Sequence, residues 1–345
     1  MKSKVLFKVF LAFFLIYGGA LFFLSGPPLS TPLVSTLRPH ELRELTLIYS
    51  DIALERTCAF QLKNDKLTST STTYKSYGEG FLSSALHDTY LKKVNNYRKA
   101  HGLSSFTNFY NYYEDPERVI LCFTGGLENI YVLHKQSQKL APLHYKPQQN
   151  LGPMYVSHIQ PYEKNYLLMG GEVNAYASML YEVDQESLEV LNCSHFETST
   201  RAINHQNYTL TADGRGFYVE EEGLLCFDSK TKKLSHLSLA FSPQFVFHTS
   251  STTLALSLNR EQLNYSLLDK GGSISTPKSL PLPNSHVELI RGVLKGHNLY
   301  ILYYDSHHPL YKNYLCIYNL STKKLTYCLA LEAYKNLALL DMTLS

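Results

Sequence analysis

The sequence contains no tryptophan and has no large excess of charge of either sign. Its 345 residues include 32 Lys and Arg against 29 Asp and Glu, which gives a formal net charge of +3. Such a balanced chain lacks the basic field that nucleic-acid binding requires, so we expect no nucleic-acid partner. Charged residues make up only 18% and hydrophobic residues 44%, which excludes a disordered chain and permits a large core.

Common catalytic and metal-binding motifs are also missing. There is no His-Glu-x-x-His, no Cys-x-x-Cys and no Gly-x-x-x-x-Gly-Lys, so metalloprotease, zinc-ribbon and nucleotide chemistry lack support. The repeats of quinone-dependent dehydrogenases and the sialidase Asp-box both need Trp, which this chain does not have. The acidic residues Asp213 and Glu220 to Glu222 fit a solvated hairpin better than a catalytic pair. We therefore predict no metal and no cofactor.

The N-terminal segment predicts a membrane anchor. Val5 to Leu24 are 20 residues with Lys8 as the one charge, long enough to cross about 30 Å of hydrocarbon as a helix. Lys2 and Lys4 precede this run, and the next Lys or Arg after Lys8 is Arg38. The positive-inside rule then places the N-terminus in the cytoplasm and the rest of the chain on the extracytoplasmic side of the cell membrane.

This anchor divides the chain into parts. We predict a single-pass, uncleaved signal-anchor transmembrane helix over residues 1–25, a Pro-containing linker over 26–44 and a folded domain over 45–345. A cleaved signal peptide, with Gly18 and Ala20 before the cut, is the alternative.

The folded part contains a repeated turn. An aromatic residue or Leu, a short polar stretch and a closing Leu or Ile recur at 60–67 (FQLKNDKL), 133–140 (LHKQSQKL), 181–188 (YEVDQESL), 227–234 (FDSKTKKL), 267–274 (LLDKGGSI) and 318–325 (YNLSTKKL). From residue 140 to residue 325 the period is about 46 residues, which is typical of the blades of a β-propeller. The residues before each turn are mostly apolar at successive positions, as expected for strands packed against a blade on each side.

Six copies predict an all-β, six-bladed β-propeller. The first blade has only three candidate strands, at 45–49, 57–62 and 67–73, whereas an extra strand follows the sixth blade at 338–343. Strands from both termini sharing one blade would close the ring and remove an exposed edge.

Two apolar strands end in a Gly pair, in Val119–Gly126 (VILCFTGG) and Tyr166–Gly171 (YLLMGG). This order resembles kelch repeats, although the kelch Trp is replaced by Leu188, Leu234 and Leu325. The resemblance implies a propeller that binds a protein or a ligand, and it carries no catalytic residues across.

An insertion at 78–104 separates the first two blades. A helix is predicted from Gly80 to Gly102, with one packing face formed by residues spaced by three and four: Leu82, Leu86, Tyr90, Val94, Tyr97 and His101. Simple docking on the propeller is one interpretation. The other is a contact with a protein partner or a membrane through its basic residues, Lys92, Lys93, Arg98 and Lys99.

Four basic residues occur on the strands predicted to line the central channel: His158, His205, His248 and Arg291. Together they could receive an anion or a sugar carboxylate. The alternative is that strand ends are polar because they reach water.

Six cysteines in an extracytoplasmic domain invite disulfides. Cys316 and Cys328 lie symmetrically about the 319–324 turn, so we expect them to face each other across a hairpin, within disulfide reach. The alternative is that both fill core positions as small hydrophobic residues.

Two functions follow from these patterns. The first is a membrane-tethered propeller that binds a protein or a small anionic or carbohydrate ligand. The second is an extracytoplasmic propeller enzyme, a lyase, epimerase or hydrolase, acting on a carbohydrate. The missing acid–base pair favours the binding module.

Overall fold

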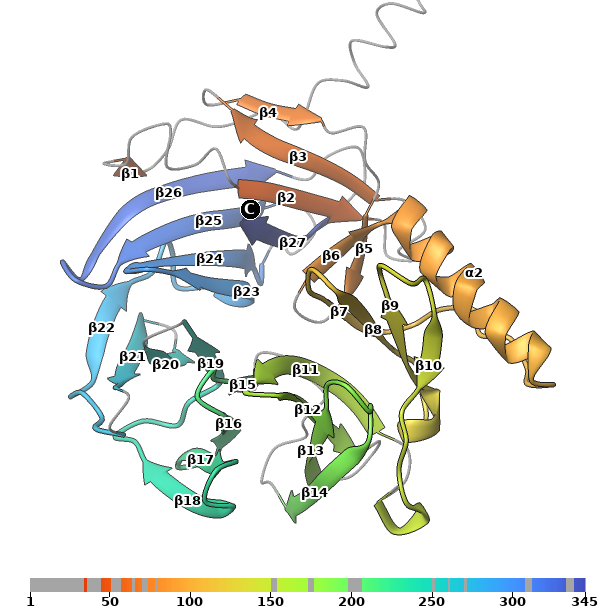
Figure 1. Ribbon diagram of the computed structural model, residues 1–345. Coiled ribbons are helices and arrows are strands. Elements are labelled where there is room, and N and C mark those ends of the chain that lie inside the picture. Colours follow the sequence, from red (N-terminus) through yellow and green to blue (C-terminus); the bar gives the residue numbers. More distant parts are fainter. Residues whose placement is uncertain are drawn as a thin grey trace, which may run out of the picture.

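The computed structural model describes residues 34–35, 45–50, 57–63, 66–69, 74–77, 80–149, 154–172, 177–197, 207–249, 252–259, 261–269, 272–307, 312–332 and 338–344. Six antiparallel sheets of four or five strands surround a central axis, as Figure 1 shows. The chain is therefore an all-β, six-bladed propeller, as the repeat predicts.

Each blade is a four-stranded meander whose first strand lies nearest the axis. Blade 1 consists of β27 (Ala338–Leu344), β2 (Leu45–Ser50), β3 (Thr57–Lys63) and β4 (Lys66–Ser69). Blade 2 consists of β7 (Asn111–Glu114), β8 (Arg118–Cys122), β9 (Ile130–His134) and β10 (Leu140–Pro142). Blade 3 consists of β11 (Met154–Tyr162), β12 (Asn165–Glu172), β13 (Ala177–Asp184) and β14 (Val190–Glu197).

The other three blades repeat this order. Blade 4 consists of β15 (Tyr208–Leu210), β16 (Arg215–Glu220), β17 (Gly223–Asp228) and β18 (Lys233–Ser238). Blade 5 consists of β19 (Phe245–His248), β20 (Thr253–Leu258), β21 (Gln262–Leu268) and β22 (Lys278–Pro281). Blade 6 consists of β23 (Val287–Lys295), β24 (Asn298–Asp305), β25 (Lys312–Asn319) and β26 (Lys324–Glu332).

The C-terminal strand closes the ring, as predicted. β27 is the inner strand of blade 1 and pairs antiparallel with β2, with Leu45 opposite Leu344 and Ser50 opposite Ala338. At the neighbouring blade, β1 (Val34–Ser35) adds a fifth, outermost strand to β26. The strands β1 and β27 thus lie in adjacent blades, and the backbone groups of β2 that would otherwise form an open edge are paired.

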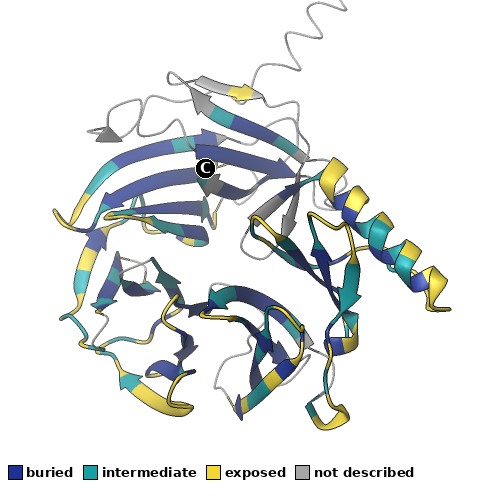
Figure 2. Cartoon of the chain, in the orientation of Figure 1, coloured by how far each residue is buried: buried dark blue, intermediate teal, exposed yellow. Residues whose placement is uncertain are grey.

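The core lies between the blades rather than at the axis. In β25, Leu315 and Ile317 pack toward blade 1, whereas Cys316 and Tyr318 pack toward blade 5. Successive strand residues point to opposite faces of a sheet, so a strand covered on both faces must be apolar throughout. Figure 2 shows this pattern, with buried strands inside each blade and exposed residues at the turns and on outer strands such as β18.

The insertion between blades 1 and 2 is a β-hairpin followed by a helix. β5 (Tyr74–Tyr77) pairs with β6 (Gly80–Ser83), and α2 runs over Ser84–Ala100. The predicted start at Gly80 is therefore wrong by four residues. The helix begins after Ser83, whose Oγ accepts a hydrogen bond from the backbone N–H of Leu86 at 3.3 Å.

The buried face of α2 differs in part from the predicted face. Tyr90 and Val94 are buried as expected. Leu86, however, is 44% exposed, and its neighbour His87 is only 1% exposed because it bonds to Asn108 and stacks on Phe109. A polar residue with a partner thus replaces an apolar one on the packing face.

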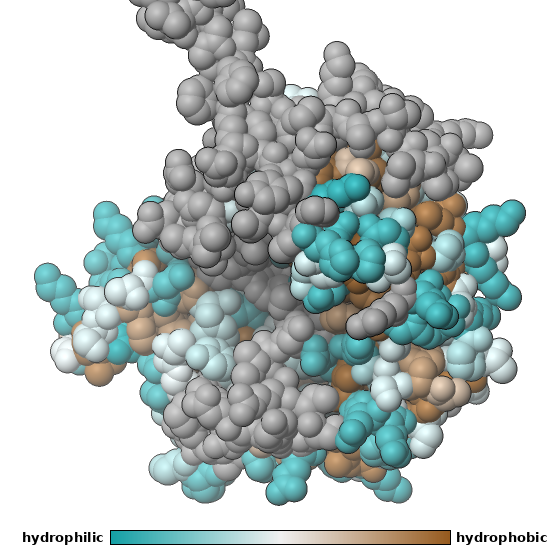
Figure 3. Space-filling view, turned by 180° about the vertical axis from the view of Figure 1, so that it is seen from behind, coloured by the Kyte–Doolittle hydropathy of each residue, from teal (hydrophilic) through white to brown (hydrophobic). Residues whose placement is uncertain are grey.

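Two short 3₁₀ turns complete the described structure, at Leu127–Asn129 and Pro147–Gln149. Within the part of the chain that the structure describes, no helix has the length and apolarity needed to span a membrane. The predicted anchor at 1–25 lies outside the described residues. Figure 3, a view from behind, shows exposed hydrophobic side chains in separate groups between hydrophilic ones.

Candidate ligand-binding site at the mouth of the channel

Two of the predicted channel residues occupy the same place on their blades. The inner strands β11 and β23 each contain a bulge, and the residue that follows it is His158 in β11 and Arg291 in β23. β27 has a bulge as well, followed by Asp341. A bulge inserts an extra residue and changes the direction of the side chains beside it. These three polar residues therefore occupy the same position relative to a bulge on an inner strand.

Inner-strand residues link three pairs of neighbouring blades. Arg291 of blade 6 forms an ion pair with Asp341 of blade 1, with 3.4 Å between Nε and Oδ1. The His158 ring of blade 3 packs edge-on against Tyr208 of blade 4, and Asn111 of blade 2 donates to the Val156 carbonyl of blade 3 at 2.9 Å. All six of these residues are buried, so the observed contacts are internal links between blades.

The other two predicted channel residues differ from this pair. His248 ends β19 and its Nδ1 lies 3.0 Å from Thr253 Oγ1 within the same blade. His205 lies outside the described residues. The structure thus aligns His158 with Arg291, while a shared ligand site for all four residues stays a prediction.

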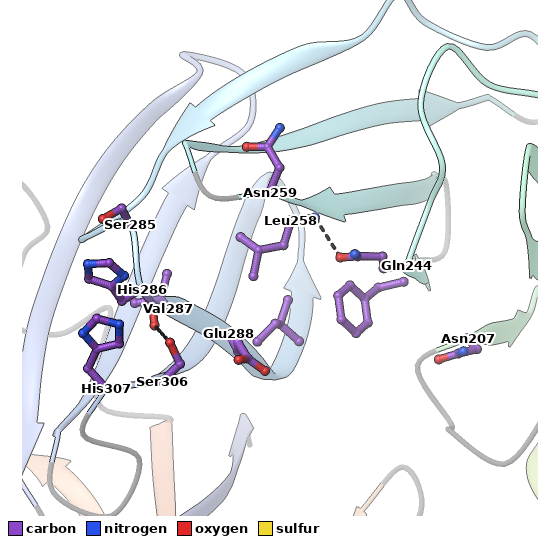
Figure 4. A pocket seen from close by; sticks show the side chains of 12 residues that line it. Asn207, Gln244, Leu258, Asn259, Ser285, His286, Val287, Glu288, Ser306 and His307 are labelled. Carbon is purple, nitrogen blue, oxygen red and sulfur yellow. Dashed lines mark hydrogen bonds between the residues drawn. The ribbon is translucent and has the colours of Figure 1, made fainter.

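A pocket opens at the mouth of the channel, between blades 5 and 6. This pocket has a volume of about 800 Å³, within the range of small-molecule sites. Its wall comes from the starts of three inner strands and from the loops after β20, β22 and β24, as Figure 4 shows. The lining residues are Asn207, Gln244, Phe245, Leu258, Asn259, Ser285, His286, Val287, Glu288, Leu289, Ser306 and His307.

Two stacked imidazole rings form one wall of the pocket. The rings of His286 and His307 lie 3.9 Å apart at an interplanar angle of 18°. The two loops are tied together because the N–H and the Oγ of Ser306 both donate to the His286 carbonyl, each at 2.7 Å. This wall is therefore held in place before any ligand arrives.

Behind the imidazoles lies a polar network. Asn284 donates from Nδ2 to Asp305 and to the Tyr314 hydroxyl, and its Oδ1 accepts from the backbone N–H of His286 at 2.7 Å. The buried carboxylate of Asp305 also accepts from the N–H of His307 at 3.0 Å. This carboxylate is thus used to fix the loops.

The opposite wall presents two amide side chains. The Gln244 Oε1 accepts from the N–H of Leu258 at 3.0 Å, and the Asn259 Oδ1 accepts from the N–H groups of Glu261 and Gln262 at 2.9 and 2.8 Å. The Asn259 oxygen therefore has both lone pairs engaged by backbone N–H groups, and the Gln244 oxygen has one of its two engaged. The NH₂ groups of Gln244 and Asn259 remain as donors at the pocket wall.

Glu288 supplies the acidic group of the pocket. It accepts a hydrogen bond from the Tyr304 hydroxyl, and this bond together with burial raises the pKa of Tyr304 to about 12. One carboxylate accepts several hydrogen bonds, so Glu288 keeps acceptor capacity for a ligand. Among the described residues no group of three or more His, Cys, Asp or Glu is arranged to hold a metal ion.

Sequence reasoning did not find this pocket. Its residues come from segments up to 100 positions apart, between Asn207 and His307, and no spacing rule joins them. One signal was present: His286 and His307 flank Glu288 and both lie in loops at strand ends, where binding residues concentrate.

The hairpin cysteines face each other as predicted. Cys316 pairs with Cys328 across β25 and β26, both are buried, and their Sγ atoms are 3.1 Å apart as two thiols. Burial raises the pKa of Cys316 well above that of an ordinary thiol. The geometry allows either the disulfide or the core interpretation.

One of the four basic residues predicted for a partner contact on α2 points inward. Arg98 is buried, with its guanidinium 3.9 Å from the centre of the Phe106 ring and NH1 2.8 Å from the Tyr131 hydroxyl. Its role is therefore to dock the helix on blade 2, because a buried cation needs such partners. Lys92 and Lys99 are exposed and Lys93 is half-buried, and for these three the partner contact stays a prediction.

No protein-family model and no curated protein matches this sequence. Solved structures with a similar arrangement include the extracellular domain of a protein described as a hybrid two component system from B. thetaiotaomicron, at 10% identity and TM-score 0.45, covering 87% of this chain and 38% of that chain. Others are Kuenenia stuttgartiensis hydrazine synthase, at 9% identity and TM-score 0.40, covering 62% and 63%, and the dihydro-heme d1 dehydrogenase NirN, at 10% identity and TM-score 0.41, covering 90% and 78%.

Proposed function

We propose that this chain is a membrane-tethered, extracytoplasmic β-propeller that binds a small ligand in the pocket between blades 5 and 6. The observation that carries the proposal is the pocket itself. Its imidazole wall is fixed by hydrogen bonds that do not involve a ligand, whereas the amide donors of Gln244 and Asn259 remain for one. A rigid wall with polar groups left over is typical of a binding site.

A propeller enzyme acting on a carbohydrate is the alternative. Hydrolysis of a glycosidic bond usually needs two carboxylates about 5–10 Å apart. The described lining residues include one carboxylate, Glu288, while Asp305 is buried and bonded to Asn284 and to the N–H of His307. This arrangement favours binding over acid–base chemistry.

The membrane tether is supported by the sequence. The apolar run from Val5 to Leu24 follows Lys2 and Lys4, which favours a cytoplasmic N-terminus and an extracytoplasmic propeller. A reporter that is active only in the cytoplasm, fused after Ser345, should therefore be silent. Reporter activity would contradict the proposed location.

The binding role is tested by blocking the mouth of the pocket. Ser285 is exposed at the pocket, so Ser285→Trp should fill the mouth without disturbing the core. Ser137→Trp, in the exposed turn between β9 and β10, is the matched control. A thermal-shift screen of full-length protein would use sugars, amino acids, carboxylates and quaternary amines.

At least one compound class should raise the melting temperature of the native chain and of Ser137→Trp, but not of Ser285→Trp. A compound that stabilises both variants equally would place binding elsewhere. If no class shifts any of the proteins, the binding proposal fails.

A further inference from the structure

The walls of this pocket differ in hydrogen-bonding character. One side offers mainly donors, the NH₂ groups of Gln244 and Asn259, because the Asn259 oxygen already accepts two backbone N–H groups and the Gln244 oxygen accepts one. The other side offers an acceptor, the Glu288 carboxylate, which already accepts one bond from Tyr304. A ligand that satisfies both sides needs groups that donate and accept.

The same pocket also has aromatic and aliphatic surfaces beside these polar groups. The stacked His286 and His307 rings form one such surface, and Phe245, Leu258 and Leu289 add others. Rings with polar edges and apolar faces fit this combination, since their C–H faces cover the aromatic wall while their hydroxyls reach the polar groups.

The charge of the pocket lining restricts the class of ligand further. Glu288 is the one carboxylate among the described lining residues, which include no Lys or Arg. A carboxylate repels anionic ligands and can accept from hydroxyl groups. A quaternary ammonium group, in turn, has no lone pair with which to accept from the two NH₂ groups.

From these three observations we infer that the ligand is a neutral carbohydrate, bound with its hydroxyls between Glu288 and the amides of Gln244 and Asn259. This inference rests on the proposed function, and it narrows the earlier choice between an anionic and a carbohydrate ligand. The volume of about 800 Å³ accommodates a ligand of this kind.

Conservative substitutions separate this ligand class from the others. Asn259→Asp and Gln244→Glu keep the oxygen that caps the backbone and replace the NH₂ donor with a second oxygen. Glu288→Gln removes the charge and keeps an acceptor for Tyr304. Glu222→Gln, in the exposed β16–β17 turn, is the matched charge control.

Binding would be measured by saturation-transfer NMR titrations of the full chain with N-acetylglucosamine, methyl glucoside, glucuronate and choline. A neutral sugar should bind. Asn259→Asp and Gln244→Glu should each weaken its binding about tenfold, as loss of one hydrogen bond does, and Glu288→Gln should weaken it about threefold because a charge-assisted bond becomes a neutral one. Glu222→Gln should change nothing.

Two other patterns would overturn the inference while leaving the pocket a binding site. Choline binding that strengthens in Asn259→Asp and is lost in Glu288→Gln would identify a cation site. Glucuronate binding that strengthens in Glu288→Gln would identify an anion site. Sugar binding that none of the pocket variants alters would contradict both the inference and the proposed function.

Discussion

Single residues on the inner strands hold neighbouring blades together. Arg291 and Asp341 belong to blades 6 and 1, the two blades where the chain closes, and both are buried. The sequence predicts Arg291 as a channel residue because Arg291 lies on a strand expected to line the central channel. It does not reveal Asp341 as the partner, since the pairing depends on closure of the ring between residues 50 positions apart.

Replacing Asp341 with Asn should destabilise the protein by about 3–5 kcal/mol, because it leaves a buried guanidinium without its carboxylate. Chemical denaturation of the full chain measures this loss. The control is Lys232→Met, which removes the exposed pair with Glu182 and should change stability by no more than about 1 kcal/mol. Equal effects of the two variants would mean that the pair at the seam contributes no more than a surface pair.

The hairpin cysteines give a second prediction at this scale. Cys316 and Cys328 are opposite each other, so an oxidising compartment should join them. Non-reducing peptide mapping of protein isolated from its native host should find the two peptides linked. Alkylation of both cysteines after unfolding without reductant would instead support the core interpretation and argue against the proposed location.

The elements were more predictable than their exact register. The end residues of the repeated turn pair with each other in two blades, Phe227 with Leu234 and Tyr318 with Leu325. In blade 3 the pair that closes the turn is Val183 with Val190, two residues further along than the ends of the repeat at 181 and 188. The reason is Asp184, whose carboxylate accepts from the N–H groups of Glu186 and Ser187 and so fixes the turn.

The Gly pairs behind the kelch resemblance also differ from each other. Gly170 lies within β12, where a side chain would collide with the Tyr155 carbonyl. Gly125 lies in the loop after β8 with a φ of +124°, a conformation that favours glycine. The two pairs thus serve separate local needs, which a sequence pattern does not distinguish.

Helix α2 offers a direct comparison of neighbouring basic residues. Arg98→Met should lower stability by about 1–3 kcal/mol, because it leaves the Ser104 carbonyl and the Tyr131 hydroxyl without their donor. Lys99→Met, one position along the exposed side, should stay within about 0.5 kcal/mol. Thermal unfolding of both variants measures these losses of stability. An equal loss in Lys99→Met would contradict the docking role of Arg98.

For the whole molecule, the sequence predicts the architecture and misses the pocket for related reasons. Six repeats, a short first blade and a spare last strand determine the ring, because each blade must bury both faces and leave no open edge. The pocket arises only after that ring has formed, when the loops of blades 5 and 6 and the start of β15 meet at the channel. Its residues therefore have no common sequence pattern.

The most direct test of this account is the stability of the full chain without its last strand. Deleting residues 337–345 removes β27, its pairing with β2, the buried Leu339 and Met342, and the carboxylate opposite Arg291. The backbone hydrogen bonds along this ladder of six residue pairs contribute about 0.5–1.5 kcal/mol each, and together with the lost burial they are comparable to a typical stability of about 5–15 kcal/mol. The truncated protein should therefore aggregate or lose cooperative unfolding. Cooperative melting near the full-length temperature would contradict closure by the C-terminal strand.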